Sequence, residues 1–407
     1  MEGQTISRAV ADRCAVVTGA NKGIGLGICR QLASNGIMVI LTARDEKRGL
    51  EAVKQLKESG LSNVVFHQLD VKDSVSIASL ADFIKTQFGK LDILLFLHMA
   101  SELEGQTTFH PVANRCAVVT GANKGIGLGI CRQLASNGIM VILTARDEKR
   151  GLEAVRQLKE SGLSNVVFHQ LDVKDSVSIA SLADFIKTQF GKLDILVNNA
   201  GVGGIIADGD ALRALNLGPD SLEGEKASSL KGVMQQTFEK AEECMAINYY
   251  GCKEVTEALI PLILLSNSAR IVNVSSEMGQ LKFLSNEMAK EVLGAADGLT
   301  EEKVDEVLQW FLKDFKEDLL EPKGWPTFLS TYCVSKAALN AYTRILAKKF
   351  PTFRINCVNP GFVKTDINFN IGILTVEEGA KGPVMLALIP DDGPTGLFYN
   401  QMEVSTY

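Results

Sequence analysis

The segment CAVVTGANKGIGLGICRQLASNG, residues 116–138, joins an apolar run to a glycine-rich turn and then to a helical pattern. The apolar run predicts a buried strand, and Gly121, Gly125 and Gly127 allow a tight turn with positive backbone φ. A helix that starts directly after such a turn presents free backbone N–H groups, which favour a bound phosphate. Alone, the turn is a weak indication of a nucleotide, because it also serves as a plain strand-to-helix connection.

The sequence after this segment strengthens the nucleotide interpretation. Three further apolar runs, IMVILTAR, VVFHQLDV and LDIL, alternate with stretches of helical pattern. Such alternation predicts right-handed βαβ crossovers and a parallel sheet covered by helices on both faces. We therefore expect an α/β fold, a Rossmann-like doubly wound sheet, in which the turn binds the pyrophosphate of a dinucleotide.

The chain contains a long internal repeat. Residues 10–94 recur as residues 112–196 with only two changes, Asp12 to Asn114 and Lys54 to Arg156. A repeat of this length is a half-domain, unlike the short units of solenoids. The near-identity of the copies fits both a duplicated segment of a working protein and an error in assembling the coding sequence.

The two copies lead into different sequences. The second continues with VNNAG and further strands and helices, whereas the first continues with LFLHMA and runs into the next copy. We therefore expect residues 1–111 to be an incomplete duplicate of the dinucleotide-binding half. Residues 112–407 are expected to form one complete domain.

Composition and charge exclude several classes of protein. A net charge of −6 over 407 residues offers no basic surface for nucleic acid. The N-terminal stretch lacks the apolar core of a secretory signal, and the longest apolar runs are about half the ~20 residues that span a bilayer. The eight cysteines form no CxxC pair and no metal site is visible. We expect a soluble cytoplasmic protein with reduced cysteines and neither nucleic acid nor membrane as partner.

The end of the second strand of the complete copy indicates which dinucleotide binds. It reads Thr144-Ala145-Arg146, without the Asp or Glu that would hold the ribose 2′-hydroxyl of NAD. Arg146 and Lys124 offer two cations for a 2′-phosphate, so NADP(H) is the predicted cofactor. The alternative is a solvated Arg146 that pairs with Asp147 or Glu148 at the start of a helix.

Three polar residues in the C-terminal half form a candidate catalytic set. Tyr332 and Lys336 are four residues apart, so they share one face of a helix. The ammonium is expected to lower the pKa of the phenol from about 10, as general acid–base catalysis needs. Ser276 ends an apolar strand and can hydrogen-bond a substrate oxygen as charge develops. Taken singly, such residues usually lie on the surface or in turns.

Six motifs then occur in a fixed order: TGANKGIG at 120–127, VNNAG at 197–201, Asn248 in MAINYYG, VNVSS at 272–276, Tyr332 to Lys336, and NPG at 359–361. In this order they resemble the short-chain dehydrogenase/reductase family, in full over residues 112–407 and again in part over 10–94. The resemblance implies carbonyl reduction, with Tyr332 as proton donor. It favours Ser276 over Ser275 as the serine at the substrate oxygen, and it implies that Asn248 holds a water in a proton relay to Lys336.

The same resemblance implies where the cofactor lies. Asp172 and Val173 should border the adenine, residues 199–201 the adenosine ribose, and the loop from Pro360 to Thr365 the nicotinamide. The full expected cofactor set is Gly121, Asn123, Lys124, Gly125, Ile126, Gly127, Arg146, Asp172, Val173, Asn199, Ala200, Gly201, Tyr332, Lys336, Pro360, Gly361, Val363 and Thr365.

An insertion separates Ser276 from Tyr332, and it is longer than the family usually has. Its apolar residues have helical spacing and predict a helix over about 300–320: Val304, Val307, Leu308, Phe311, Leu312, Phe315 and Leu319. The insertion and the subsequent GWP resemble the monomeric carbonyl reductases and their plant branch, which includes salutaridine and neomenthol reductases. This implies a monomer and a bulky apolar substrate of terpenoid or alkaloid type.

Two other functions stay open at this point. The enzyme could run in reverse as an NADP-dependent secondary-alcohol dehydrogenase. The chain could also be a non-catalytic cofactor-binding scaffold, but the loss of a Tyr, Lys or Ser that would favour this is not seen in the second copy.

Overall fold

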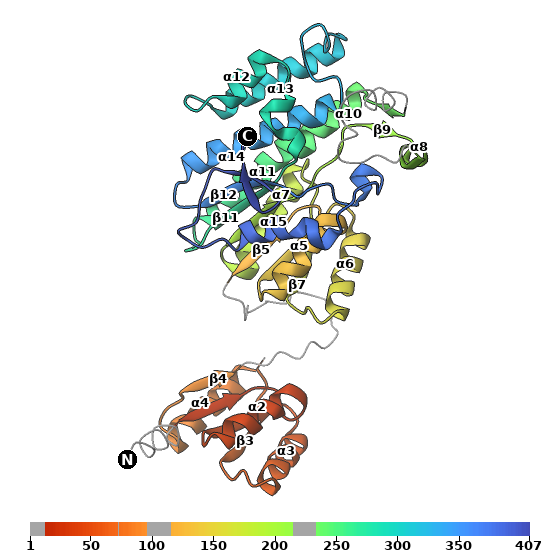
Figure 1. The fold of residues 1–407 in the computed structure, drawn as a ribbon. Helices are drawn as coiled ribbons and strands as arrows, with labels where there is room; N and C mark the ends of the chain where they lie inside the picture. The colour runs from red at the N-terminus through yellow and green to blue at the C-terminus, as the bar shows by residue number, and fades with distance from the viewer. Residues whose placement is uncertain (1–12, 72, 96–114, 215–232) are drawn as a thin grey trace, which may run out of the picture. The chain divides into compact units, whose positions relative to one another are not determined.

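The structure is a computed structural model that describes residues 13–71, 73–95, 115–214 and 233–407. The chain divides into two compact units, Met1–Gln106 and Thr107–Tyr407 (Figure 1). The boundary expected from the repeat, between residues 111 and 112, lies outside the described residues.

The first unit contains a four-stranded parallel sheet with strand order β3-β2-β1-β4. Its elements are β1 (Cys14–Val17), α2 (Gly23–Ser34), β2 (Met38–Ala43), α3 (Glu46–Glu58), β3 (Val64–Gln68), α4 (Ser74–Gln87) and β4 (Ile93–Leu95). Among the described residues, β4 pairs with β1 alone. One edge of this sheet is therefore β4.

The second unit contains an eight-stranded sheet with order β14-β13-β12-β11-β8-β5-β6-β7, in which β14 alone is antiparallel to its neighbour. The strands are β5 (Cys116–Val119), β6 (Met140–Ala145), β7 (Val166–Gln170), β8 (Ile195–Asn198), β11 (Arg270–Val274), β12 (Arg354–Asn359), β13 (Phe398–Asn400) and β14 (Glu403–Ser405). A separate two-stranded sheet pairs β9 (Ile206–Ala207) antiparallel with β10 (Met234–Gln235).

Helices connect these strands. They are α5 (Gly125–Ser136), α6 (Glu148–Glu160), α7 (Ser176–Phe190), α8 (Gly209–Ala214), α10 (Phe238–Met245), α11 (Cys252–Ile263), α12 (Glu287–Gly294), α13 (Glu301–Lys316), α14 (Ser330–Lys349) and α15 (Val376–Ala387). A π-helical turn, η2 (Ala246–Gly251), joins α10 to α11, and short 3-10 turns are η3 (Glu277–Gly279), η4 (Leu281–Phe283) and η5 (Asp366–Asn368).

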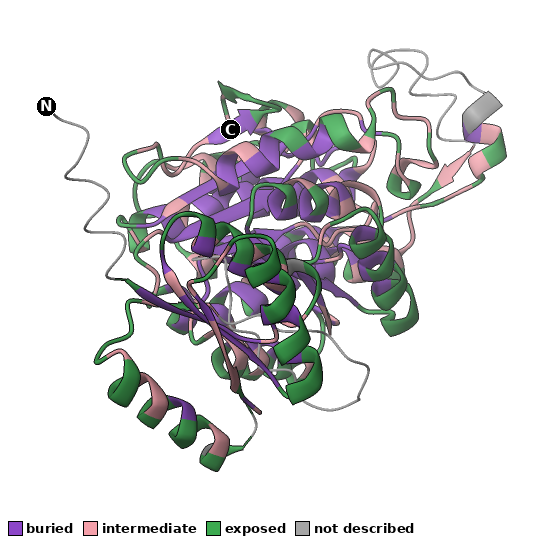
Figure 2. Ribbon diagram, turned by 90° about the horizontal axis from the view of Figure 1, so that it is seen from below, coloured by how far each residue is buried: buried purple, intermediate pink, exposed green. Residues whose placement is uncertain are grey.

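The central strands of the second unit, β5, β6, β8 and β11, consist of buried residues throughout (buried residues are purple in Figure 2). Along β5, Cys116 and Val118 belong to the core packed by α7, α11 and α14, whereas Ala117 and Val119 belong to the core packed by α5, α6 and α15. Alternate residues of a strand point to opposite faces, so a near-continuous apolar run is what such a strand needs. The expected doubly wound α/β fold is confirmed.

The strand order reverses beside β5, which lies between β6 and β8. In open parallel sheets, ligands bind in the crevice at the carboxyl ends of the strands at such a switch point. The glycine-rich turn comes after β5 and the VNNAG segment after β8. Topology therefore brings these two motifs to the same edge of the sheet.

The insertion forms α13, which packs beside α12, α14 and α10 (Figure 1). Thr300 caps its first turn, and Val304, Val307, Leu308 and Phe311 are fully buried. The expected extent of about 300–320 was too long at the C-terminal end. The helix ends at Lys316, and Asp318 has a left-handed φ of 54°, so Leu319 lies beyond it.

The described ranges hold no helix with both the length and the apolar character needed to cross a bilayer. Within the same ranges no His, Cys, Asp and Glu side chains gather in a group that could hold a metal. All eight cysteines are free thiols with buried side chains.

Candidate active site

The glycine-rich turn is shaped by close contacts that exclude side chains. Gly121 has a φ of 61°, and a Cβ on it would lie 2.9 Å from Cα of Ala200. A Cβ on Gly127 would lie 2.5 Å from Nδ2 of Asn199. Glycine is thus required at these positions, because the segment after β8 lies directly against the turn.

Asn199 ties the two segments together. Its side-chain amide donates to the carbonyl oxygens of Thr120 (2.9 Å) and Gly121 (3.1 Å). The backbone N–H groups of Asn199 and Ala200 both donate to the Thr120 hydroxyl, at 2.9 and 3.0 Å. The structure thus places Asn199 and Ala200 against the turn, where they hold its carbonyl groups in place.

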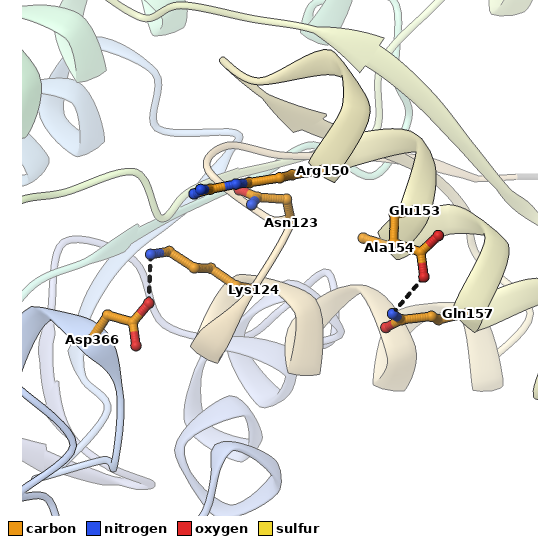
Figure 3. A pocket seen from close by; sticks show the side chains of 7 residues that line it. All are labelled: Asn123, Lys124, Arg150, Glu153, Ala154, Gln157 and Asp366. Atoms are coloured by element: carbon orange, nitrogen blue, oxygen red, sulfur yellow. Dashed lines mark hydrogen bonds and ion pairs between the residues drawn. The ribbon is translucent and has the colours of Figure 1, made fainter.

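A cavity of about 410 Å³ opens beside the turn (Figure 3). The residues that line it are Asn123, Lys124, Arg150, Glu153, Ala154, Gln157 and Asp366. Asn123 and Lys124 come from the turn and Arg150 from the first part of α6, so two cations and an amide face one space. Sequence reasoning missed Arg150. Its signal is its position four residues after Arg146, one helical turn onward.

Arg146 does not line this cavity, although it was expected there together with Lys124. Its side chain is exposed, and its backbone carbonyl accepts a hydrogen bond from Gln170 at 2.9 Å. The alternative pairing with Asp147 is also not formed. Asp147 instead accepts from the backbone N–H of Arg150 at 2.9 Å and caps α6. Lys124 pairs with Asp366 at 2.6 Å.

The other residues expected at the cofactor lie around the turn. Thr365 contacts the turn, since its Cγ2 lies 3.4 Å from a Cβ placed on Gly125. Gly361 has a φ of 86° and donates its N–H to the Asn359 side chain at 3.1 Å, which shapes the NPG loop. Within that loop Pro360 and Val363 are buried.

Three further expected positions differ in their surroundings. Asp172 accepts from the backbone N–H of Lys174 at 3.0 Å, and Val173 packs against Gly251. Ile126, in the first turn of α5, packs partly buried against the core beneath the helix. A packing role therefore accounts for the Ile126 side chain.

Tyr332 lies in the first turn of α14, and its hydroxyl is hydrogen-bonded to the hydroxyl of Ser276. The neighbouring Ser275 is buried and donates to the Asn340 side chain at 2.6 Å. Of the two serines in VNVSS, only Ser276 thus adjoins the phenol.

Lys336 lies one turn further along α14, as its spacing from Tyr332 predicted. It is 4% exposed, and its Nζ lies 5.8 Å from the centre of the Tyr332 ring. The Nζ donates to the carbonyl oxygen of Val274 at 2.9 Å. Burial lowers the pKa of Lys336 to about 8, because it disfavours the charged form.

The expected decrease in the pKa of Tyr332 is wrong for this structure. Burial raises the pKa of Tyr332 to about 12, and the hydrogen bond from Ser276 lowers it only in part. Removing the phenolate from water costs more than the hydrogen bond from Ser276 returns. The phenol is therefore protonated at neutral pH.

Asn248 lies in the π-helical turn η2, a feature often found at functional sites. Its side-chain oxygen accepts from the N–H of Val202 at 2.9 Å, and its amide donates to the Val202 carbonyl and the Ser335 hydroxyl, both at 3.0 Å. A Cβ on Gly201 would lie 3.3 Å from Asn248 Oδ1 and 3.6 Å from Lys336 Nζ. The VNNAG segment, Asn248 and Lys336 therefore meet at one point.

Comparison with known proteins agrees with this geometry. The family model described as short chain dehydrogenase matches residues 13–101 and 115–289. Salutaridine reductase of Papaver bracteatum is 59% identical over 299 residues, which cover 72% of this chain and 96% of that protein. The (+)-neomenthol dehydrogenase of Arabidopsis thaliana is 58% identical over 297 residues, with 72% and 98% covered.

Two further proteins extend the comparison. Carbonyl reductase [NADPH] 3 of Mus musculus is 38% identical over 309 residues, with 72% of this chain and 99% of that protein covered. The solved structure of salutaridine reductase from Papaver somniferum is 58% identical, with a TM-score of 0.66, and covers 70% of this chain and 99% of its own.

Proposed function

Since the chain belongs to the short-chain dehydrogenase/reductase family of oxidoreductases, we propose that it reduces a ketone or aldehyde to an alcohol with NADPH. The observation that carries the proposal is the convergence of Tyr332, Ser276 and Lys336 near the glycine-rich turn. A proton donor, a hydroxyl beside it and a buried cation are the groups that carbonyl reduction needs.

The cavity beside the turn supports NADP(H) as cofactor. Lys124, Arg150 and Asn123 face it, and charge-assisted hydrogen bonds from such groups suit a 2′-phosphate. The turn and the start of α5 suit the pyrophosphate, because helix N-termini favour anions. The mouse relative carries NADPH in its name. When bound, NADPH supplies the hydride.

The chain's own residues handle the proton. With its pKa raised, Tyr332 is protonated at neutral pH and can donate its hydroxyl proton to the carbonyl oxygen of the substrate. Ser276, hydrogen-bonded to Tyr332, is placed to donate to the same oxygen. Lys336, with a pKa of about 8, is mostly charged at neutral pH, and its charge favours the phenolate that forms. Asn248 hydrogen-bonds Val202 and Ser335. These contacts suit a residue that positions the catalytic side chains.

A bulky apolar substrate is the class that the relatives favour. Their names refer to salutaridine, neomenthol and isopiperitenone, which are alkaloid and terpenoid compounds. The dehydrogenase names also favour a second candidate, the reverse oxidation of a secondary alcohol with NADP.

We extend the proposal to the organisation of the chain. The packing of α13 over α14 and α10 supports a monomer, because the inserted helix occupies this face within one chain. A cytoplasmic location is in keeping with the buried free thiols. Residues 1–111 are proposed to be an incomplete duplicate of the dinucleotide-binding half, and residues 112–407 the enzyme.

Consumption of NADPH by the purified chain tests the function. The chain is incubated with NADPH or NADH and a panel of cyclic ketones and aldehydes, and loss of the reduced cofactor is followed by absorbance. We expect consumption with NADPH for at least one ketone and much less with NADH. Tight binding of NADPH without turnover of any carbonyl or of the corresponding alcohols with NADP would instead indicate a scaffold.

A further inference from the structure

Two carboxylates line the cavity that a 2′-phosphate would use. Glu153 pairs with Arg156 on the same helix, whereas Asp366 pairs with a cation of the cavity itself. Asp366 lines the same cavity as Lys124 and Arg150, and its Oδ2 lies 2.6 Å from the Nζ of Lys124 (Figure 3). Both side chains are more than half exposed, at 60% and 57%. A second anion can therefore reach this pair from solvent.

The loop after the NPG motif holds Asp366 in place. The other carboxylate oxygen of Asp366 accepts from the Asn370 side chain at 3.3 Å. The N–H of Asn370 donates to the Thr365 carbonyl at 2.8 Å, and the N–H of Thr365 donates to the Asn368 side chain at 3.2 Å. Asp366 is thus carried by a folded turn that lies against Gly125.

The charges of Lys124 and Arg150 both act on Asp366. The hydrogen bond from Lys124 is the largest cause of a lowered pKa of Asp366, and the positive charge of Arg150 lowers it further. Asp366 is therefore ionised at neutral pH. It partly neutralises both cations on which the proposed function relies for the 2′-phosphate.

We infer that Asp366 is a specificity-determining residue that competes with the 2′-phosphate of NADP(H) for Lys124. The inference rests on the proposed function, since it assumes that the phosphate binds in this cavity. The incoming phosphate has to displace the carboxylate from Lys124, and the carboxylate remains nearby as a like charge. Asp366 thereby limits the preference for NADP(H) over NAD(H) that Lys124 and Arg150 could otherwise provide.

The expected effect of removing this charge is modest, because exposed ion pairs are weak. In the Asp366→Asn variant we expect 2′,5′-ADP to bind about two- to tenfold more tightly. Binding of 5′-AMP, which lacks the 2′-phosphate, should not change. In a Lys124→Gln background the gain should shrink, because the competition for Lys124 is then absent.

A second ion pair provides a matched control. Arg132 on α5 pairs with Glu377 on α15 at 2.9 Å, with exposures of 45% and 56%. This pair also joins α5, the helix after the glycine-rich turn, to α15, the helix after the loop that carries Asp366. Neither residue of the pair lines the cavity. Glu377→Gln removes the same charge and should leave the preference for 2′,5′-ADP unchanged.

The experiment is calorimetric titration of 2′,5′-ADP and 5′-AMP into the full chain, the three single variants and the Lys124/Asp366 double variant. Circular dichroism checks folding, and Asp366→Ser replaces Asp366→Asn if the latter is unfolded. A larger preference for 2′,5′-ADP in the Asp366 variant alone supports the inference. An unchanged or smaller preference, or an equal gain in Glu377→Gln, overturns it. No preference in the unaltered chain would instead overturn the proposed NADP(H) site.

Discussion

Leu94 and Leu196 occupy equivalent positions in two nearly identical segments, yet the first has 55% of its surface exposed and the second 0%. Ile77 and Ile179 differ in the same way, at 48% and 3%. The difference is not a general looseness of the first copy, because Leu50 is 52% exposed, as is its equivalent Leu152. It also reaches the opposite face of the sheet, where Ile28 and Leu32 on α2 are only partly buried, whereas the equivalent Ile130 and Leu134 are fully buried.

The local structure of the two copies is nevertheless the same. Thr42 donates to the Val17 carbonyl at 3.1 Å in the first, and Thr144 donates to the Val119 carbonyl at 3.0 Å in the second. The first glycines of the turns have φ values of 59° and 61°. Nearly identical sequence therefore produces the same order of strands and helices, and α7 and β8 are each one residue longer than α4 and β4.

The burial of these side chains depends on residues that follow the second copy in the sequence but not the first. There β8 pairs with β11, which places Leu196 opposite Ile271, and α11 packs against α7. Among the described residues of the first unit, β4 has no strand on its outer side. An apolar sheet edge of this kind favours association with other chains. The comparison shows that half of this fold specifies its own backbone but not the covering of its surface.

The largest expected effect is on catalysis. Of the two units compared, only the second contains the proposed catalytic residues. Tyr332→Phe removes the proton donor and keeps the ring, so turnover should fall by about 10² to 10⁴ while NADPH still binds. Steady-state kinetics and cofactor titration measure the two effects. Turnover equal to that of the unaltered chain would exclude Tyr332 from the mechanism.

The next effect concerns stability. Leu196→Ala opens a cavity in a closed core and should cost about 2 to 5 kcal/mol. Leu94→Ala changes an exposed side chain and should cost about 0.5 kcal/mol or less. Both tryptophans, Trp310 and Trp325, lie in the second unit, so urea unfolding followed by their fluorescence reports the first substitution, and circular dichroism reports both. Equal losses would mean that the first copy is covered as well as the second.

A smaller effect concerns the cofactor. Arg150→Gln removes a cation from the cavity and should weaken NADPH by about 1.5 to 3 kcal/mol, with little change for NADH. Arg48 is the equivalent residue of the first copy, so Arg48→Gln serves as the matched control and should leave the KM for NADPH unchanged. A comparable rise in KM for both variants would assign cofactor binding for catalysis to both copies.

The smallest effect is expected from removing the first copy altogether. A chain that begins at residue 112 should keep its NADPH turnover, because every residue of the proposed site lies in the second unit. It should also be more soluble, since the edge at β4 is gone. Activity assays and sedimentation at increasing concentration test both points. An inactive or unfolded product would mean that the first copy belongs to the working enzyme.

Sequence reasoning performed best where the controlling interactions are local. The glycine turn, the helical spacing of Tyr332 and Lys336, and the apolar stripe of α13 are each specified within a few residues. It failed where distant segments meet. Arg150 and Asp366 come together from α6 and from the loop after β12, and no spacing indicates that contact. The pKa of Tyr332 was predicted from its neighbour Lys336, but it depends on burial by several elements.

The π-helical turn η2 has a consequence for the phase of the helix around it. A π-turn contains one residue more than a regular helical turn, so α10 and α11 are offset by about 100° of rotation from a continuous helix. With this offset Cys244 and Val255 are both buried, while Asn248 between them reaches Val202. Deleting one residue of η2 would restore a regular helix. It would also rotate α10 relative to α11, so that Cys244 and Val255 could not both face the core. The extra residue thus sets the rotation between α10 and α11 that buries both Cys244 and Val255 while Asn248 reaches Val202.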